Sequence, residues 1–236
     1  MKSLLETTEN TRDLGGYTRK NGEKTRCDQF LRSDKPGCPS KSDFHFLLSH
    51  GITTIIDLRE EAAVNRQENP FLGCPGFSWH HCPIVEGSSI PESVEAVPGS
   101  YLQIAESPGA AEAFRVMGAA PGGVLFHCSA GKDRTGTLSA ILLTLADVPE
   151  EQIVQDYLLS RECLRDRQEL LRQRFPELDM NIVTPSEHHI TGFLRLWKEK
   201  YATAENYLHS IGLTDLEIEH IRRKLFEGTS EEIVCG

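Results

Sequence analysis

Strand-like and helix-like hydrophobic patterns alternate along the first 150 residues. The run from Ile52 to Leu58 is β-branched and almost continuously apolar, which is typical of a buried parallel strand. Similar patterns predict further strands at 77–85, where the strand ends near Pro83, and at 124–127. Helices are expected between and after them, at 44–50, at 60–67 and over 101–117, the last broken at Ser107-Pro108-Gly109.

The second half of the chain is helical in pattern. Leu138, Ile141, Leu142 and Leu145 fall on one helical face, at spacings of three and four residues. A charged helical region follows at 150–200, with turns near 175–176 and 184–185, and a helix pair is expected over 202–226. Strands alternating with helices, followed by helices alone, predict an α/β fold: a central, mainly parallel sheet flanked by helices, with a C-terminal helical region.

Composition narrows the class of protein. The 236 residues, 39% hydrophobic and 25% charged, suit a single soluble domain spanning 1–236. A net charge of −10 argues against nucleic acid or an anionic membrane as partner. The longest apolar stretch, 140–146, is too short for integral membrane association, and residues 1–12 lack the apolar core of a secretory signal.

The cysteines bear on metal binding and on compartment. Seven are present without any Cys-x-x-Cys pair, so a zinc site is not expected. Free thiols in a reducing compartment are the simpler interpretation, and a cytoplasmic location is therefore predicted. Secretion by a route without a recognisable signal stays open.

One segment has the pattern of an anion site. The chain reads Val-Leu-Phe-His-Cys-Ser-Ala-Gly-Lys-Asp-Arg-Thr-Gly over 124–136, so that a predicted strand, a seven-residue loop from Cys128 to Arg134 and a helix from about Thr135 follow one another. Successive backbone N–H groups in such a loop form a concave nest, and the helix N-terminus adds positive charge. Gly131 relaxes the loop, and the Arg134 guanidinium forms a planar fork for two phosphate oxygens.

Cys128 lies at the start of that positive loop. An ordinary thiol has a pKa of about 8.5, but helix N-termini and nearby cations lower it to about 3.5–7.5. The loop therefore predicts a thiolate nucleophile placed in line with a bound phosphorus atom. His127 and Thr135 flank the loop, and either is placed to hydrogen-bond within it and steady the thiolate.

A phosphomonoester also needs a proton donor for its leaving group. We expect Asp133 to be that general acid, with Asp57, Glu86, Glu92 and Glu95 as reserves, because no other aspartate lies between Asp57 and Asp133. The alternative is that Asp133 only caps the helix or pairs with Arg134.

The neighbouring charges have two interpretations each. Lys132 is either a second phosphate-binding cation or a solvated charge. Asp57 and Arg59 stand at the end of a predicted parallel strand, and a structural ion pair that braces the loop is favoured over a chemical role.

At these residues the chain resembles the cysteine phosphatases with the signature His-Cys-x5-Arg-Ser/Thr, matched by His127, Cys128, Arg134 and Thr135. The variant at 130–136 is similar to microbial tyrosine phosphatases that include secreted mycobacterial and listerial enzymes. Weaker motifs of that family occur in order along most of the chain: Asn10–Tyr17, Leu31–Ser33, Asp57–Arg59, Asp156–Leu158 and Tyr207–Leu213.

The resemblance implies a phosphocysteine intermediate on Cys128, with no metal and no cofactor. It implies phosphate binding by the backbone from Ser129 through Ala130, Gly131 and Lys132 to Arg134, and it supports an acid role for Asp133. It also implies that 150–200 contains helices able to cover the active site, as a helical insertion or lid.

The expected activity is metal-independent hydrolysis of phosphotyrosine in a protein, with phosphoserine and phosphothreonine as a wider range. Phosphoinositides are the alternative substrate, because Lys132 is similar to a lysine in the loops of phosphoinositide phosphatases. A rhodanese-like sulfurtransferase and a catalytically inactive phosphate-binding module are further alternatives, and the Lys-Asp-Arg-Thr-Gly run disfavours the first.

Overall fold

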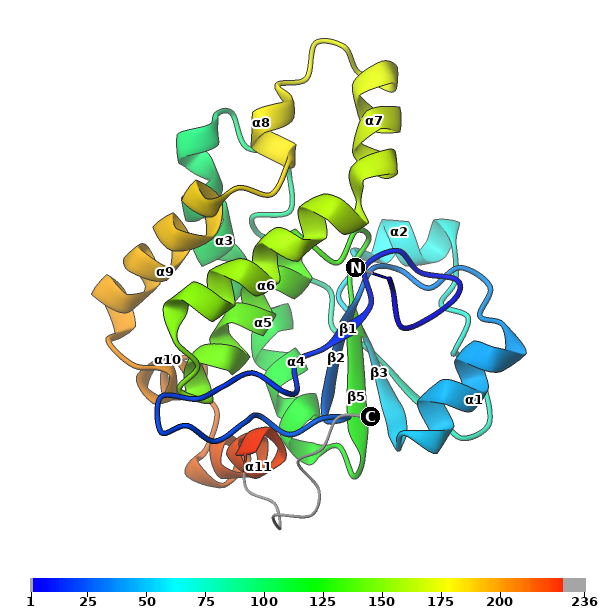
Figure 1. Ribbon diagram of the computed structural model, residues 1–236, viewed down its shortest axis with the longest axis vertical. Coiled ribbons are helices and arrows are strands. Elements are labelled where there is room, and N and C mark those ends of the chain that lie inside the picture. The colour runs from blue at the N-terminus through cyan, green and yellow to red at the C-terminus, as the bar shows by residue number, and fades with distance from the viewer. Residues whose placement is uncertain (1, 227–236) are drawn as a thin grey trace.

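The computed structural model describes residues 2–226 and contains a five-stranded sheet with the order β1-β2-β5-β3-β4. Strands β2, β5, β3 and β4 are mutually parallel, and only β1 runs antiparallel, against β2. The predicted α/β fold with a mainly parallel sheet is confirmed (Figure 1). The strands are β1 (Arg12–Asp13), β2 (Phe30–Ser33), β3 (Ile52–Asp57), β4 (Ser78–His81) and β5 (Gly123–His127).

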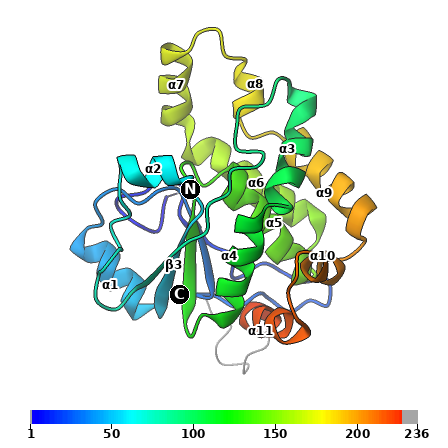
Figure 2. The ribbon, with the colours of Figure 1, turned by 180° about the vertical axis from the view of Figure 1, so that it is seen from behind.

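Helices cover both faces of this sheet (Figures 1 and 2). Helix α1 packs on β3 from one side, whereas α5 packs on β2 and β5 from within a larger helical layer on the other. The helices are α1 (Lys41–Ser49), α2 (Glu61–Arg66), the short 3-10 helix η1 (Val94–Ala96), α3 (Val97–Ala105), α4 (Pro108–Ala119), α5 (Asp133–Leu145), α6 (Glu150–Cys163), α7 (Arg165–Arg174), α8 (Met180–Val183), α9 (Glu187–Tyr201), α10 (Ala204–Ser210) and α11 (Asp215–Phe226).

The alternation of side chains along the strands builds a separate apolar cluster on each face. Leu31, Ile55 and Leu125 lie in the smaller cluster with α1, whereas Phe30 and Phe126 lie in the larger one. All five side chains are at most 1% exposed. The two-sided burial explains why β3 and β5 read as continuous apolar runs.

Several boundaries differ from those expected. The strand predicted over 77–85 is only four residues long as β4, although the Cys82 and Ile84 N–H groups on either side of Pro83 still donate to the Asp57 and Leu58 oxygens. The segment 87–99, expected as a loop, contains η1 and the start of α3. The long helix predicted over 101–117 does break where expected, since the Ser107 side chain caps α4 and Pro108 occupies its first turn. That one domain spans 1–236 stays a prediction, and residues 1 and 227–236 lie outside the described part.

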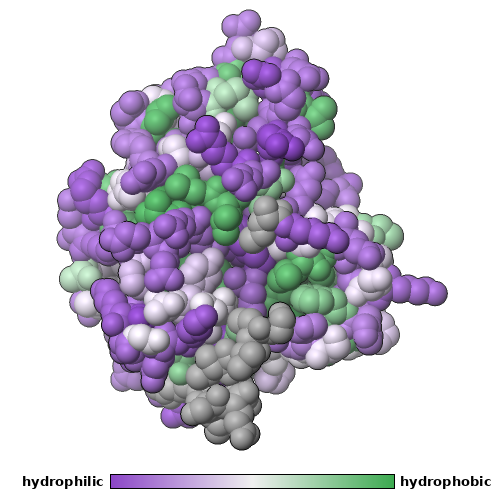
Figure 3. All heavy atoms as spheres, in the orientation of Figure 1, coloured by the Kyte–Doolittle hydropathy of each residue, from purple (hydrophilic) through white to green (hydrophobic). Residues whose placement is uncertain are grey.

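Helices α7 and α8 project together from one end of the molecule in both ribbon views (Figures 1 and 2). The face drawn in Figure 3 is largely hydrophilic, and its apolar atoms gather in separate patches. Over the part of the chain that is described, no helix combines the length and the apolar character needed to cross a bilayer.

Candidate active site

The loop after β5 lies at the carboxyl edge of the sheet, between the ends of β2 and β3. Parallel sheets place ligands at this edge. Helix α5 begins at Asp133, two residues earlier than expected, so that its first turn is part of the loop. Gly131 has φ of +68°, and a Cβ there would lie 2.6 Å from the Ser33 carbonyl oxygen. Only glycine therefore fits where the loop passes over β2.

The carbonyl groups of the loop are held from outside by hydrogen bonds. The Ser129 oxygen accepts from Arg167 Nη1 at 2.9 Å and from the Lys35 backbone N–H at 3.3 Å. Asn10 Nδ2 donates to the Ala130 oxygen at 3.0 Å. The Gly131 oxygen accepts from Arg32 Nη2 at 2.7 Å. With its carbonyls bonded in this way, the loop keeps its N–H groups available for an anion.

Cys128 lies at the base of this loop and is 2% exposed. The Gly131 N–H donates to its Sγ at 3.3 Å. Burial alone would raise the pKa of the Cys128 thiol, but the Arg134 charge and the Thr135 hydroxyl and N–H outweigh it and lower the pKa below its ordinary value. Thr135 Oγ1 is buried and has no other hydrogen-bond partner within residues 2–226, which leaves it available to the sulfur. The arrangement favours a thiolate.

Arg134 and Asp133 line a cavity of about 70 Å³ above the loop. Arg134 is half-buried, and within residues 2–226 its one bond to the protein backbone is a long contact of 3.4 Å from Nη1 to the Leu58 oxygen. A weakly held guanidinium beside the nest is free to bind an oxyanion. The rest of the wall comes from Lys132, from segment 87–91, from α3 and from Ile182 and Val183 in α8.

Lys132 also lines the cavity and is largely buried. Its side chain is 8% exposed, and Nζ donates to the Val183 oxygen at 2.5 Å and lies 3.0 Å from Asp133 Oδ1. It is therefore not a solvated charge. Its ammonium group has three N–H donors and these contacts engage two, so a role in phosphate binding stays a prediction.

His127, Asp57 and Arg59 form a buried group behind the loop. Asn69 Nδ2 donates to His127 Nε2 at 2.8 Å, so that Nδ1 carries the proton and donates to the Cys128 oxygen at 3.1 Å. Burial lowers the pKa of His127, so the ring is neutral at neutral pH and is protonated only in acid, where its charge acts on Asp57. The Arg59 side chain donates to Asp57 through Nε at 2.9 Å and Nη2 at 2.6 Å.

This ion pair is part of the scaffold. Burial would raise the pKa of Asp57, but His127, the Arg59 fork and the Asn69 amide together lower it to about 2. A carboxylate held in its ionised form by these donors is poorly suited to donate a proton. The other reserve acids, Glu86, Glu92 and Glu95, are exposed and lie outside the set of cavity-lining residues. Of the acids considered, Asp133 alone lines the cavity.

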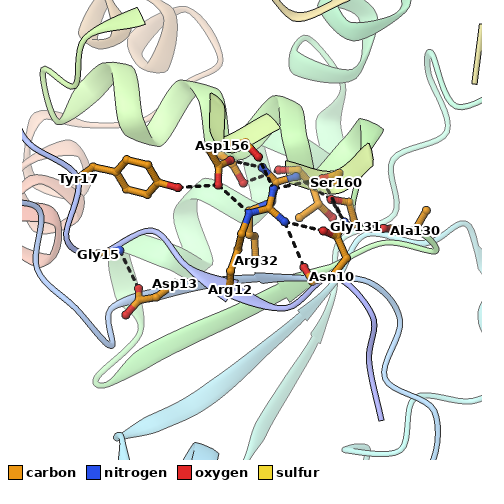
Figure 4. Close-up of polar contacts among 12 residues, drawn as sticks. Asn10, Arg12, Asp13, Gly15, Tyr17, Arg32, Ala130, Gly131, Asp156 and Ser160 are labelled. Atoms are coloured by element: carbon orange, nitrogen blue, oxygen red, sulfur yellow. Dashed lines mark hydrogen bonds and ion pairs between the residues drawn. The ribbon is translucent and has the colours of Figure 1, made fainter. Parts of the chain in front are cut away.

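A second buried network supports the loop from the α6 side (Figure 4). Asp156 accepts from Arg12 Nε at 2.8 Å, from Tyr17 Oη at 2.9 Å and from Arg32 Nη1. Arg32 then reaches the loop through the Gly131 oxygen. Burial would raise the pKa of Asp156, but Arg12 and Arg32 lower it to about 2.

The sequence of the loop does not predict this network. The structure places Asp133 and Arg134 in the wall of one cavity. Cys128 interacts with Arg134 and Thr135, and His127 bonds the Cys128 oxygen from behind the loop. Asn10, Arg12, Arg32 and Asp156 have no local chemical signal, since they are distant in sequence. Their only trace was that each lies in one of the weaker motifs shared with microbial phosphatases.

Three known proteins similar to this chain are named as phosphatases. It is 32% identical over 177 residues to a putative tyrosine-protein phosphatase of Cupriavidus necator, covering 67% of this chain and 62%, less than two thirds, of that protein. A tyrosine-protein phosphatase of Nostoc commune is 27% identical over 84% of this chain and 74% of its own length. The triple specificity protein phosphatase PtpB of Mycobacterium tuberculosis is 31% identical over 42% of each chain.

Among solved structures, P. aeruginosa TpbA in complex with phosphotyrosine has 13% identity and a TM-score of 0.38, over 83% of this chain and 84% of that one. A family model described as the tyrosine phosphatase family matches residues 4–227. This match takes in both the Cys128 loop and the α6 network, and the chain belongs to the tyrosine phosphatase family.

Proposed function

We propose that this protein hydrolyses phosphomonoesters through a phosphocysteine on Cys128, without a metal, and that phosphotyrosine in proteins is its main substrate. The observation that carries the proposal is the position of the Cys128 sulfur. It lies at the base of a loop whose carbonyls are bonded outward, beside a guanidinium with one long backbone contact. A tetrahedral oxyanion would complete these donors.

The chemistry follows in two steps. The Cys128 thiolate attacks phosphorus and forms an S–P bond while the P–O bond to the alcohol breaks, and Asp133 gives its proton to the leaving oxygen. Water then attacks phosphorus, loses a proton to Asp133 and releases the thiolate with inorganic phosphate. Arg134 and the N–H groups of 129–134 stabilise the charge on the phosphoryl oxygens in both steps.

The test is turnover of an aryl phosphate in the presence of a chelator. Activity is expected without added metal and is expected to be inhibited by orthovanadate, a phosphate-like oxyanion. Cys128→Ser should abolish turnover, whereas Cys82→Ser is the matched control. Cys82 is also a buried free thiol, but burial raises its pKa to about 12, so it stays protonated. Full activity in Cys128→Ser would refute the mechanism.

Apolar side chains in the cavity wall support phosphotyrosine as the main substrate. Ile90 and Pro91 line it together with Ile182 and Val183, and such apolar walls suit a flat aromatic ring next to the phosphate. Turnover of phosphoserine and phosphothreonine should be measured as well. The name of the M. tuberculosis relative, a triple specificity phosphatase, supports including them.

Phosphoinositides are the alternative substrate class within the same mechanism. Lys132 is the residue that favours them, and its ammonium group donates to the Val183 oxygen and lies 3.0 Å from Asp133 Oδ1. Turnover of phosphotyrosine peptides and inositol lipids, measured in parallel at equal enzyme concentration, decides between the two. A thiosulfate–cyanide assay tests the sulfurtransferase alternative, for which no turnover is expected. A cytoplasmic location stays a prediction.

We also propose that α7 and α8 act as a lid over the cavity. Two contacts support this proposal: Arg167 on α7 bonds the Ser129 oxygen, and Lys132 bonds the Val183 oxygen at the end of α8. Between these contacts, α8 supplies Ile182 and Val183 to the cavity wall. The cavity of about 70 Å³ is small for a phosphopeptide side chain, so substrate entry requires this segment to move.

A further inference from the structure

The two carboxylate oxygens of Asp133 have different surroundings. Oδ1 accepts a hydrogen bond from Tyr101 Oη at 2.5 Å and lies 3.0 Å from Lys132 Nζ. Within residues 2–226, Oδ2 has no hydrogen-bond partner, although the side chain as a whole is 39% exposed and faces the cavity. One oxygen is therefore fixed by the protein, and the other is available for the proton that a leaving group takes.

Tyr101 is itself held by a second tyrosine. It lies on α3, is 1% exposed, and its Oη is 2.7 Å from Tyr157 Oη. A phenol has one proton, and Tyr101 donates its proton to Asp133, so Tyr157 must donate to Tyr101. The chain of bonds thus has a fixed direction, from Tyr157 through Tyr101 to Asp133.

The rings that carry these hydroxyls are fixed by packing. Tyr101 meets Tyr157 edge-on at 6.1 Å between ring centroids and meets Phe193 of α9 edge-on at 6.3 Å. Burial raises the pKa of both Tyr101 and Tyr157 well above the ordinary value, so each remains a hydrogen-bond donor. Many buried tyrosines only fill space in a core and have no role in chemistry. Here the two hydroxyl groups form a chain of hydrogen bonds that ends at the carboxyl group of Asp133, which lines the cavity.

We propose that Tyr101, oriented by Tyr157, is the positioning residue of the general acid: it fixes Oδ1 of Asp133 so that Oδ2 presents the proton to the leaving group. This inference rests on the proposed function. In this proposal α6 has two roles. Asp156 holds Arg32, which bonds the Gly131 oxygen of the anion loop, and the next residue, Tyr157, orients the acid through Tyr101.

The experiment measures kcat/KM of Tyr101→Phe on a series of aryl phosphates whose phenols differ in acidity. An acidic phenol leaves without help, whereas a weakly acidic phenol needs the proton of Asp133. The loss expected is about tenfold or more for the least acidic phenol and about twofold or less for the most acidic. In an Asp133→Asn background, the same tyrosine change should have no further effect.

Tyr207→Phe is the matched control. Tyr207 is as buried as Tyr101, and its hydroxyl donates to the Ala105 backbone oxygen at 2.6 Å, away from the cavity. Any loss of kcat/KM in Tyr207→Phe should be the same for every phenol in the series. Tyr157→Phe keeps the Tyr101–Asp133 contact and should show a smaller loss with the same dependence, so the test holds even if Tyr101→Phe is poorly folded.

A loss in Tyr101→Phe that is equal for all phenols, or that adds fully to the loss in Asp133→Asn, would overturn the inference while leaving the phosphocysteine mechanism intact. Failure of the proposed function has a different signature, namely full activity in Cys128→Ser.

Discussion

Replacing Asp156 with asparagine should destabilise the protein more than the same aspartate-to-asparagine substitution at any exposed position. Asp156 is 1% exposed and carries the negative charge between two buried guanidinium groups, those of Arg12 and Arg32. Asparagine has the same shape, but it leaves both cations without their counter-charge. Breaking a buried ion pair on one side lowers the free energy of unfolding by about 3–5 kcal/mol.

The pH dependence gives a second magnitude. The pKa of Asp156 is about 2 in the folded protein, below its ordinary value of 3.8, because Arg12 and Arg32 outweigh the opposing effect of burial. A carboxyl group whose pKa is lower in the folded protein than in the unfolded chain stabilises the fold at any pH above the unfolded pKa. This stability is lost as the pH falls from about 4 to about 2. The shift corresponds to roughly 2 kcal/mol. The substitution should remove more than this, because asparagine places a donor NH2 group where one carboxylate oxygen accepted a bond from an arginine.

The assay is urea unfolding of both proteins at pH 7 and at several values down to pH 3, with the free energy obtained by linear extrapolation. Asp156→Asn should lose about 3–5 kcal/mol at pH 7 and show a shallower fall in stability below pH 4. Asp166→Asn is the control, since Asp166 pairs with Arg165 on the exposed face of α7 and should change stability by about 0.5 kcal/mol or less. A loss below about 1 kcal/mol in Asp156→Asn would refute the reasoning.

Two further predictions concern the loop. Gly131→Ala should lose most phosphatase activity and about 1–3 kcal/mol of stability, because its Cβ would meet the Ser33 backbone. The control is Gly22→Ala, at an open position with φ of +88°, which should lose about 1 kcal/mol of stability and keep its activity. Normal activity in the first would contradict the close approach of the loop to β2. Arg167→Ala should raise the rate of Cys128 alkylation by iodoacetamide about two- to tenfold, because α7 loses its bond to the Ser129 oxygen, with Arg172→Ala as the exposed control. Equal alkylation rates in the two variants would argue against the lid.

The nucleophile loop could be predicted from the sequence because its parts are contiguous. Cys128, Gly131 and Arg134 lie within seven residues, and the apolar run before them and the helical pattern after them define the geometry. The sheet was predictable for a similar reason, since β3 is buried on both faces and its residues show this directly.

The supporting residues could not be predicted in the same way. Asp156 is 144 residues from Arg12 and 124 from Arg32 along the chain, and nothing local to any of the three indicates that they meet. The inward orientation of Lys132 depends on α8, a helix of four residues with little periodic signal. Tyr101 and Tyr157 belong to separate helices, and each reads in the sequence as an ordinary aromatic core residue.

The central claim is that phosphate becomes bonded to Cys128 during turnover. The most direct measurement is rapid acid quenching of the protein with excess aryl phosphate, followed by peptide mass spectrometry. One phosphoryl group is expected on the sulfur of the peptide containing Cys128, and none in Cys128→Ser. Burst-phase release of the phenol, with an amplitude near one per protein, should accompany it when phosphocysteine hydrolysis is the slower step. Turnover with phosphate found on a different residue, or with unmodified Cys128 throughout despite a burst, would contradict the account.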